Sequence, residues 1–338
     1  MKIKRLFINN YKSLVNFELV EPNPFLVFVG PNAAGKSNVF EALEFFNYRD
    51  YPNPELLFGG VKSISHLNKI HNKIAINLWL DKNENPHHLI FSLDSENNRW
   101  FLKTKDGFSL KDNRDEEEEN LLNEISPNFP QFFDRFSRIF VGKNDLVKIK
   151  TNGPEKLRID AANLEPVLHR ILQDEIKREE ITEWLELLIP GLEKVKVAKS
   201  DLSGDYFLRI FEKHLSEPIG KNLISDGTYN ILALLTAVYQ SDEPQFLCIE
   251  EPENGLNPYV IRTLVGFFRQ MCEEKGHYIW LNTHSATLVR ELRNEEIILI
   301  DKKEGITQAK QIPPDFNRYD LEMDEAWLTN ALGGGLPW

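Results

Sequence analysis

The segment Gly30–Ser37 (GPNAAGKS) constrains the fold of this chain more than any other stretch of its sequence. It follows the apolar run Phe25–Val29 and precedes a segment with helical spacing, which is the strand–loop–helix context of the phosphate-binding loop G-x-x-x-x-G-K-[S/T]. Gly30 and Gly35 permit backbone angles that side chains forbid, so successive amide N–H groups can point inward at phosphate oxygens. The following helix N-terminus adds partial positive charge. The segment therefore predicts a phosphate-binding site.

Two side chains at the end of this loop carry charge and metal chemistry. Lys36 supplies a point charge for the β- and γ-phosphates, and the hydroxyl of Ser37 can ligate Mg²⁺. An ordinary glycine-containing turn would explain the glycines, but not a Gly-Lys-Ser sequence in register with them. The sequence predicts that the chain binds ATP or GTP, with contacts from Gly30, Asn32, Ala33, Ala34, Gly35, Lys36, Ser37 and Asn38.

Length and composition bound the class of protein. The 338 residues suffice for one large or two small domains with a buried core. No stretch approaches the roughly 18–20 apolar residues of a membrane span, and the N-terminus lacks the apolar core of a cleavable signal. Cys248 and Cys272 both lie in apolar surroundings, which indicates neither a disulfide framework nor a zinc site. We expect a cytoplasmic protein without a membrane partner.

The net charge of −12 argues against non-specific coating of nucleic acid, because such affinity comes from Lys and Arg neutralising phosphates. The acidic run Asp112–Glu119 contributes to this charge and is predicted to be a solvated loop. A local basic groove stays open as an alternative, because cations gather at Arg135, Arg138, Lys143, Lys148, Lys150, Lys156 and Arg158.

Hydrophobic patterning divides the chain into three stretches: 1–60, 61–215 and 216–338. The first is predicted to contain strands Lys2–Ile8, Leu14–Val20 and Phe25–Val29, then the loop and a helix over Ser37–Tyr48. The second is predicted to contain strands Ile74–Leu80, His88–Leu93, Arg99–Lys103 and Ser137–Val141, helical spacing over 161–189, and a hairpin of Lys194–Ala198 with Tyr206–Phe211. The third returns to alternating strands and helices: Gly227–Gln240 (helix), Gln245–Ile249 (strand), Pro258–Glu274 (helix), Tyr278–Asn282 (strand), Ala286–Leu292 (helix) and Ile297–Ile300 (strand).

Two glutamates end the apolar strand Gln245–Ile249. A carboxylate at a strand end beside a phosphate loop is where Mg²⁺ needs a hard oxygen ligand, so Glu250 is the candidate metal ligand. Glu251 is placed to activate a water for attack on the γ-phosphate. Without the phosphate loop, a solvated strand end would be the better explanation of the pair; with the loop, the pair indicates catalysis.

Two further segments suit contact with an anion. Ser225-Asp-Gly227 begins an apolar helix and offers a hydroxyl and bare amides, although an ordinary helix cap would also explain it. Thr283-His284 follows the strand Tyr278–Asn282, where the His284 ring could contact the γ-phosphate or simply cap the next helix.

In this order, the four elements resemble the ABC-type ATPase heads of the SMC, RecF and OLD group. Gly30–Ser37 is similar to Walker A, and Ser225–Gly227 to the ABC signature. Walker B with its catalytic glutamate is similar to Gln245–Glu251, the D-loop to Glu251–Pro258, and the switch histidine to His284. The resemblance covers about residues 1–60 and 220–300 and implies ATP and Mg²⁺ as cofactors. It also implies that Lys12, in the Asn10–Ser13 element, lies near the base and ribose.

The implied fold is α/β: an ABC/SMC-head-like P-loop ATPase with an N-terminal antiparallel β subdomain. A short helical insertion takes the place of long coiled-coil arms. Glu250 in place of Asp, and Ser-Asp-Gly-Thr in place of Ser-Gly-Gly-Gln, are similar to the OLD-like, "AAA-type, ABC-like" branch. The best candidate for the Q-loop is Gly142–Asp145, with Asn144 replacing Gln.

The resemblance implies a dimer with ATP at its interface, in which Ser225 and Gly227 contact the nucleotide held by the partner's Lys36. Hydrolysis through Glu251 would then reopen the dimer. In this branch such a switch controls a separate effector nuclease in anti-phage defence. We expect that nuclease to act in trans, since the 54 residues after His284 are too few for the TOPRIM domain of OLD proteins.

A tail bearing Trp327 and Leu332–Trp338 suits a protein partner, or is a frayed terminus. The alternative function is a RecF-like DNA-binding ATPase in repair or recombination, favoured by the local basic cluster and disfavoured by the net charge. A transporter ATPase is a third interpretation, and the long interval between Lys36 and Ser225 and the lack of a clear coupling glutamine count against it.

Overall fold

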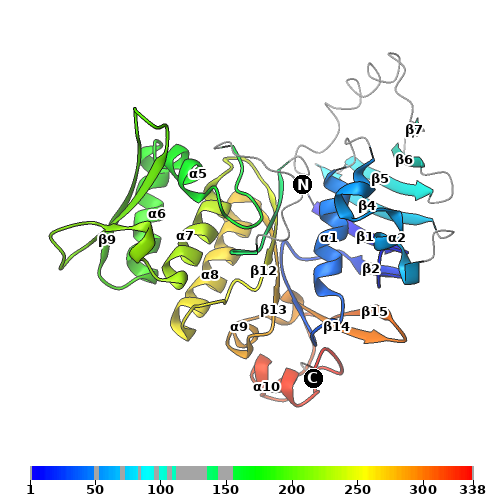
Figure 1. The fold of residues 1–338 in the computed structure, drawn as a ribbon. Coiled ribbons are helices and arrows are strands. Elements are labelled where there is room, and N and C mark those ends of the chain that lie inside the picture. The colour runs from blue at the N-terminus through cyan, green and yellow to red at the C-terminus, as the bar shows by residue number, and fades with distance from the viewer. Residues whose placement is uncertain are drawn as a thin grey trace.

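The computed structural model describes residues 2–48, 53–68, 73–82, 85–94, 99–104, 109–111, 135–143 and 155–336 (Figure 1). Its strands are β1 (Lys2–Asn9), β2 (Phe17–Val20), β3 (Phe25–Val29), β4 (Ile74–Lys82), β5 (Asn85–Asp94), β6 (Arg99–Thr104), β7 (Ser109–Lys111), β8 (Phe136–Ile139), β9 (Leu192–Lys199), β10 (Tyr206–Glu212), β11 (Ile219–Gly220), β12 (Phe246–Glu250), β13 (Tyr278–Thr283), β14 (Ile297–Lys303) and β15 (Ile306–Gln311).

The α-helices of the described residues are α1 (Lys36–Asn47), α2 (Val61–Ile64), α5 (Leu164–Ile171), α6 (Glu175–Leu188), α7 (Asp226–Tyr239), α8 (Pro258–Lys275), α9 (Ala286–Arg290) and α10 (Met323–Leu328). Short 3₁₀ turns are η1 (Pro54–Phe58), η2 (His66–Asn68), η4 (Lys221–Leu223) and η5 (Asn294–Glu296). Among these helices, none combines the length and apolar character needed to span a bilayer.

The central sheet has the strand order β15-β14-β3-β13-β12-β8. Its five strands from β14 to β8 are parallel, and β15 pairs antiparallel with β14 at one edge. Strand β3, expected from an apolar run, is confirmed with the same bounds and is buried throughout. Because parallel strands end at the same edge of a sheet, the segments that follow β3, β13, β12 and β8 meet there.

Side chains of β3 alternate between two hydrophobic cores, as the period of a strand requires. Phe25, Val27 and Val29 pack into the core formed with α5 to α8 and α10. Leu26 and Phe28 face the other way, into the core shared by α1 and the antiparallel sheet. In Figure 1, α1 accordingly lies between the central strands and β4, and α7 and α8 cover the opposite side.

The antiparallel sheet has the order β2-β1-β4-β5-β6-β7. Strand β1 pairs with β2 on one side and with β4 on the other, so strands before and after residue 60 share one sheet. The proposed boundary at 60/61 therefore falls inside this sheet. The strand expected over Leu14–Val20 is shorter, because Tyr11 and Leu14 exchange backbone hydrogen bonds in a tight turn and Asn16 adopts a positive φ of 50°.

A three-stranded sheet, β11-β10-β9, packs on α5 and α6. The helical spacing over 161–189 corresponds to two helices, since the chain leaves α5 at Leu172 and Asp174 caps α6 by accepting from the amides of Ile176 and Lys177. The α/β fold class is confirmed. The described residues form no coiled-coil arm, because the longest helix, α8, has 18 residues.

The expectation for the C-terminal tail is corrected by burial. Trp327, expected on a tail that suits a partner or frays, lies on α10 and is 1% exposed, and Leu332 is fully buried. Lys310 donates to the Leu332 carbonyl at 2.7 Å, which holds this segment against β15. The tail through residue 336 is therefore part of the folded core, and Trp338 lies outside the described residues.

Candidate nucleotide-binding site

The phosphate loop is shaped by its glycines. Gly35 has φ 103°, and a Cβ there would lie 2.1 Å from the Thr307 hydroxyl, so no side chain fits. A Cβ on Gly30 would lie 2.0 Å from the carbonyl oxygen of Ile300 on β14. Ala33 also has a positive φ, of 59°. This backbone is the form in which loop amides can turn toward an anion.

A chain of hydrogen bonds through Ser13 and Thr307, which lie outside the phosphate loop, holds the loop backbone at Ala34. The Asn38 amide donates to the Ser13 hydroxyl at 2.7 Å, which lies 2.6 Å from the Thr307 hydroxyl. Thr307 donates to the carbonyl of Ala34 at 2.7 Å, so Ser13 is the donor to Thr307. The side-chain amide of Asn38, a residue expected to contact nucleotide, is thus bonded to Ser13. Thr307 lies on β15, and no motif in the sequence pointed to it.

Lys36 is 6% exposed, and its side chain folds back over the phosphate loop. Its Nζ donates to the carbonyls of Gly30 at 2.7 Å and Pro31 at 2.9 Å. Burial lowers the pKa of Lys36 to about 8, despite the opposing charges of Glu251, Glu253 and Glu250. The loop therefore holds its cation in a partly desolvated position, where an incoming anion would interact with it strongly.

This pKa predicts a pH dependence of nucleotide affinity. Phosphate charge favours the protonated amine, so binding above about pH 8 should take up a proton, and ATP affinity should fall between about pH 7 and pH 9. Calorimetry at about pH 8.5 in two buffers of different ionisation enthalpy measures this uptake. Lys36→Met should abolish it, and equal heats for the wild type in both buffers would contradict the assignment.

The candidate metal ligands Ser37 and Glu250 come together. The Ser37 hydroxyl donates to Glu250 Oε2 at 2.6 Å, although 213 residues separate them in the chain. Asn282, on β13 between β3 and β12, donates through Nδ2 to the same Glu250 oxygen at 3.1 Å and to Ser37 Oγ at 3.3 Å. A hydroxyl and a carboxylate oxygen in contact are hard donors that fit Mg²⁺.

The other oxygen of Glu250 is held by Arg138, from β8. Arg138 Nε donates to Glu250 Oε1 at 2.5 Å, and Nη1 donates to Glu44 Oε2, on α1, at 2.9 Å. All three side chains are at least nine-tenths buried. Although burial acts to lower it, the charges of Glu250 and Glu44 raise the pKa of Arg138 above its ordinary value. The arginine therefore leaves Oε2 of Glu250 facing Ser37.

The burial of Arg138 changes the expectation that the basic cluster is exposed to solvent. Arg138 is 3% exposed and cannot contact nucleic acid, and Arg158 pairs with Asp160 at 3.0 Å with 17% of its side chain exposed. Lys148 and Lys150 lie outside the described residues. Of the described members, Lys143 alone is exposed. Arg135 and Lys156 are half-buried, so the described members of the cluster expose less positive charge than the sequence suggested.

Lys12 is joined to the same ionic network. Its Nζ lies 2.6 Å from Glu41 Oε1, and the Tyr11 hydroxyl donates to that oxygen at 3.2 Å. Glu41 is in turn 4.0 Å from Arg138. Lys12 has a positive φ of 48°, and its backbone pairs with Ile64. The structure thus places Lys12 on the α1 side of the site, with its ammonium group already paired.

Glu251 and His284 lie together at the ends of β12 and β13. His284 Nε2 is 3.8 Å from Glu251 Oε1, and Asn254 donates to Glu251 Oε2 at 3.0 Å. Glu251 adopts φ 47°, and its amide donates to the carbonyl of Asn282. Burial and the charge of Lys36 lower the pKa of His284, which favours the neutral ring. Both side chains are one-third exposed, so water can reach them.

Glu253 is a site residue that the motif comparison did not single out. Its Oε1 accepts from the Thr283 hydroxyl at 2.5 Å and from the His284 amide at 3.1 Å. Burial raises the pKa of Glu253, and its Oε2 has no hydrogen-bond partner among the described residues. Glu253 therefore ties the turn after β12 to the segment that carries His284.

Ser225 caps α7, as its sequence context predicted. Its Oγ accepts from the Thr228 amide at 3.1 Å, and the side chain is exposed. A Cβ on Gly227 would lie 2.5 Å from the Gly255 carbonyl, so the signature and the D-loop-like turn touch. No hydrogen bond between described residues joins Ser225 to the phosphate loop of the same chain. Asn257 likewise caps α8, with Pro258 at its first position.

A cavity of about 430 Å³ separates the start of α7 from the end of β8. Glu250 and Glu251 line it together with Gly142, Asp226 and Gly255. Gly142 begins the segment proposed as the Q-loop, and the strand before it is Phe136–Ile139 rather than Ser137–Val141. Asn144 lies outside the described residues. The cavity gives solvent access to the carboxylates from the signature side.

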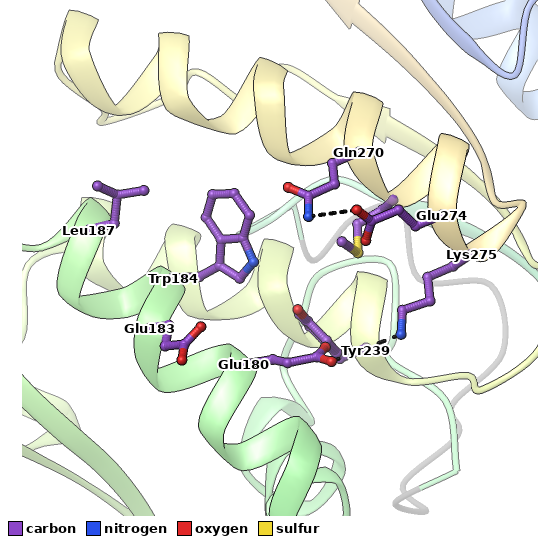
Figure 2. A pocket seen from close by; sticks show the side chains of 9 residues that line it. Glu180, Glu183, Trp184, Leu187, Tyr239, Gln270, Glu274 and Lys275 are labelled. Carbon is purple, nitrogen blue, oxygen red and sulfur yellow. Dashed lines mark hydrogen bonds and ion pairs between the residues drawn. The ribbon is translucent and has the colours of Figure 1, made fainter.

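A second cavity, of about 310 Å³, lies between α6, α7 and α8 and shares no residue with this site (Figure 2). Trp184 and Tyr239 form its apolar wall. Four of its polar groups form two pairs: Gln270 donates to Glu274 at 3.1 Å, and Lys275 lies 4.0 Å from Glu180. We assign no catalytic role to this surface hollow.

Comparison with solved structures identifies the fold. The Smc head bound to the C-winged helix domain of ScpA matches with a TM-score of 0.66 at 13% identity, covering 92% of this chain and 98% of that chain. The SMC head domain from Thermotoga maritima gives 0.58 at 13% identity, covering 93% and 100%. A Pyrococcus furiosus Smc head with an extended coiled coil, bound to the C-terminal domain of ScpA, gives 0.62 at 12%, covering 92% and 96%.

No curated protein sequence matches the chain. A family model described as "AAA domain, putative AbiEii toxin, Type IV TA system" matches residues 25–290. That range includes the phosphate loop, the signature-like segment, Glu250, Glu251 and His284. It also includes the buried Arg138 that supports them. The chain therefore belongs to this AAA_21 family of P-loop ATPase domains, with an ABC/SMC-head-like fold.

Proposed function

We propose that the chain binds and hydrolyses ATP as a dimeric switch that controls a separate effector. The observation that carries this proposal is the contact between Ser37 and Glu250 at 2.6 Å, with Lys36, Glu251 and His284 around it. Such a set supplies phosphate binding, a metal position and a base in one place. The family description and the SMC-head fold support an ATPase of this kind.

In this proposal each side chain has a stated task. Lys36 and the loop amides bind the β- and γ-phosphates, and Ser37 and Glu250 hold Mg²⁺. The bound Mg²⁺ would neutralise phosphate charge. Glu251 accepts a proton from the attacking water, while Asn254 orients its carboxylate. His284, kept neutral by burial and Lys36, can donate a hydrogen bond toward the γ-phosphate.

The exposed N-terminus of α7 supports a dimer. Ser225 and Gly227 lie at this terminus and do not contact the phosphate loop of their own chain, so a second copy can use them. Contacts made only when ATP is present would then close the dimer, and hydrolysis would release it. A γ-phosphate would thereby control the shape of the assembly.

The effector is proposed to be a nuclease acting in trans in a bacterial anti-phage system. The family description names a toxin of a type IV toxin–antitoxin system, which supports a role in such conflict. A RecF-like role in repair loses the contribution of Arg138 to the basic cluster, because that side chain is buried. Co-purification with a nuclease encoded by a neighbouring gene would distinguish the first role from the second.

The direct test is Lys36→Ala, measured by titration of a fluorescent ATP analogue. The variant should lose affinity at least tenfold, because Lys36 is the loop's only cation and forms no ion pair with a carboxylate of the described residues. Lys62→Ala, at an exposed position on α2, is the matched control and should bind normally. Unchanged binding by Lys36→Ala would refute the site.

A further inference from the structure

The three-stranded sheet presents a solvent face of unusual composition for this acidic chain. Strands β9 and β10 pair antiparallel, with Lys194 opposite Phe211, Lys196 opposite Arg209 and Ala198 opposite Phe207. The intervening side chains, Val195, Val197, Leu208 and Ile210, are buried against α5 and α6. The six outward positions therefore hold three cations, two phenyl rings and no carboxylate.

The two central cations of this face, Lys196 and Arg209, have no carboxylate partner among the described residues. Lys196 and Arg209 are exposed and lie directly across the ladder from each other, an arrangement that destabilises a sheet. Neither forms an ion pair with a described carboxylate, whereas Lys194 at the end of the face pairs with Glu193 at 2.9 Å. Although the chain has 52 acidic residues, none of those that the structure describes pairs with these two cations. This unpaired charge suits an anionic ligand.

The phenyl rings occupy alternate positions beside the cations. Phe207 is 51% exposed, whereas its neighbour Leu208 points inward and is buried. Lys194 and Lys196 lie 5.1 Å and 5.5 Å from the centroid of the Phe211 ring. Positions two apart on a strand are separated by about 6.8 Å, so rings and cations alternate along a row. Such a row offers stacking surfaces next to charges.

We propose that this face, made of Lys194, Lys196, Phe207, Arg209 and Phe211, binds single-stranded nucleic acid. Cations that track a phosphate backbone, combined with rings on which unpaired bases stack, are the two elements of such sites. Sheet faces with outward aromatics bind single-stranded RNA in the same way. Figure 1 shows the sheet projecting beyond α6, on the far side from α8. The inference goes beyond the proposed ATP switch and does not depend on it.

The mixture of rings and cations favours nucleic acid over an acidic polypeptide. The carboxylates of an acidic polypeptide would pair with the cations, but such a polypeptide has no regular series of flat groups that could stack on the exposed phenyl rings. The test therefore separates the two contributions. Charge contacts to phosphate release counterions and set the salt dependence, whereas stacking does not.

The experiment measures fluorescence anisotropy of 5′-fluorescein dT15 and U15 against the full chain over a salt series. Lys196→Ala with Arg209→Ala should weaken binding at least tenfold at low salt and reduce the slope of log K against log salt by about 1.4. Phe207→Ala should weaken binding by about 5- to 150-fold and leave that slope unchanged. Lys2→Ala with Lys62→Ala removes two exposed lysines of the other lobe and should change neither quantity.

Three results would overturn the inference: no binding of either oligonucleotide by the wild type at low salt, face variants that bind like the wild type, or poly-glutamate competing as well as oligonucleotide. ATP-analogue binding should stay at the wild-type value in all these variants, because none lies at the nucleotide site. If the wild-type chain binds the oligonucleotides but not the ATP analogue, the proposed ATP switch fails while the inference about the β9–β10 face stands.

Discussion

Glu251→Gln is expected to bind ATP normally but to hydrolyse it about 10²–10⁴-fold more slowly, the usual contribution of a general base. Glutamine keeps the size of the side chain and can still meet Asn254, which donates to Glu251 Oε2 at 3.0 Å. It cannot accept a proton from water. Glu251 is one-third exposed, so its loss should cost little stability.

Three readouts separate this role from others. Phosphate release measures turnover, a fluorescent ATP analogue measures affinity, and size-exclusion chromatography with ATP measures the dimer. The variant should accumulate dimer, because bound ATP persists. Glu243→Gln, at an exposed position before β12, is the control and should behave like the wild type. Wild-type turnover by Glu251→Gln would show that Glu251 is not the base.

Arg138→Met is expected to lower the free energy of unfolding by about 3–5 kcal/mol, the usual cost of removing one partner of a buried ion pair. Glu250 and Glu44 would be left buried without their shared cation, since Arg138 donates to both, at 2.5 Å and 2.9 Å. Arg138→Lys should recover part of the loss, because an ammonium keeps the charge but lacks the planar fork that reaches two carboxylates.

The pH dependence of this defect has a definite sign. Without Arg138, desolvation should raise the pKa of the buried carboxylates in the folded variant. The folded state then binds more protons than the unfolded state, so the loss of stability should shrink as the pH falls from about 8 to about 5. Urea titration at both pH values measures this loss of stability. A separate titration of the ATP analogue with and without Mg²⁺ measures whether the variant still holds the metal at Glu250.

Arg293→Met provides the control for Arg138→Met. Arg293 is 57% exposed, and its ion pair with Glu273 is solvated at 3.8 Å. The buried Glu296, 4.0 Å from Arg293, keeps its two hydrogen bonds from Arg269, so the loss of Arg293 should cost less than about 1 kcal/mol. Equal losses for the two variants, or a defect in Arg138→Met that does not change with pH, would contradict the buried-network interpretation.

Sequence reasoning performed best where neighbouring residues decide the structure. The phosphate loop, its preceding strand and the cap Ser225 all depend on spacing within about one turn of chain. The break between α5 and α6 is a local signal that was missed. Asp174 offered an N-cap inside the apolar stripe, but the stripe continued across it and the period concealed the break.

The sequence by itself determined the residue types of the site: Gly35 where no Cβ fits, Lys36 for phosphate, and carboxylates directly after a buried strand. The tertiary structure alone decided which distant residues support them. Arg138 was interpreted as a surface cation, and only the pairing of β8 with β12 brings it to Glu250. Thr307 braces the loop because β15 folds back beside it. Such contacts depend on strand order and burial, and neither is a property of local sequence.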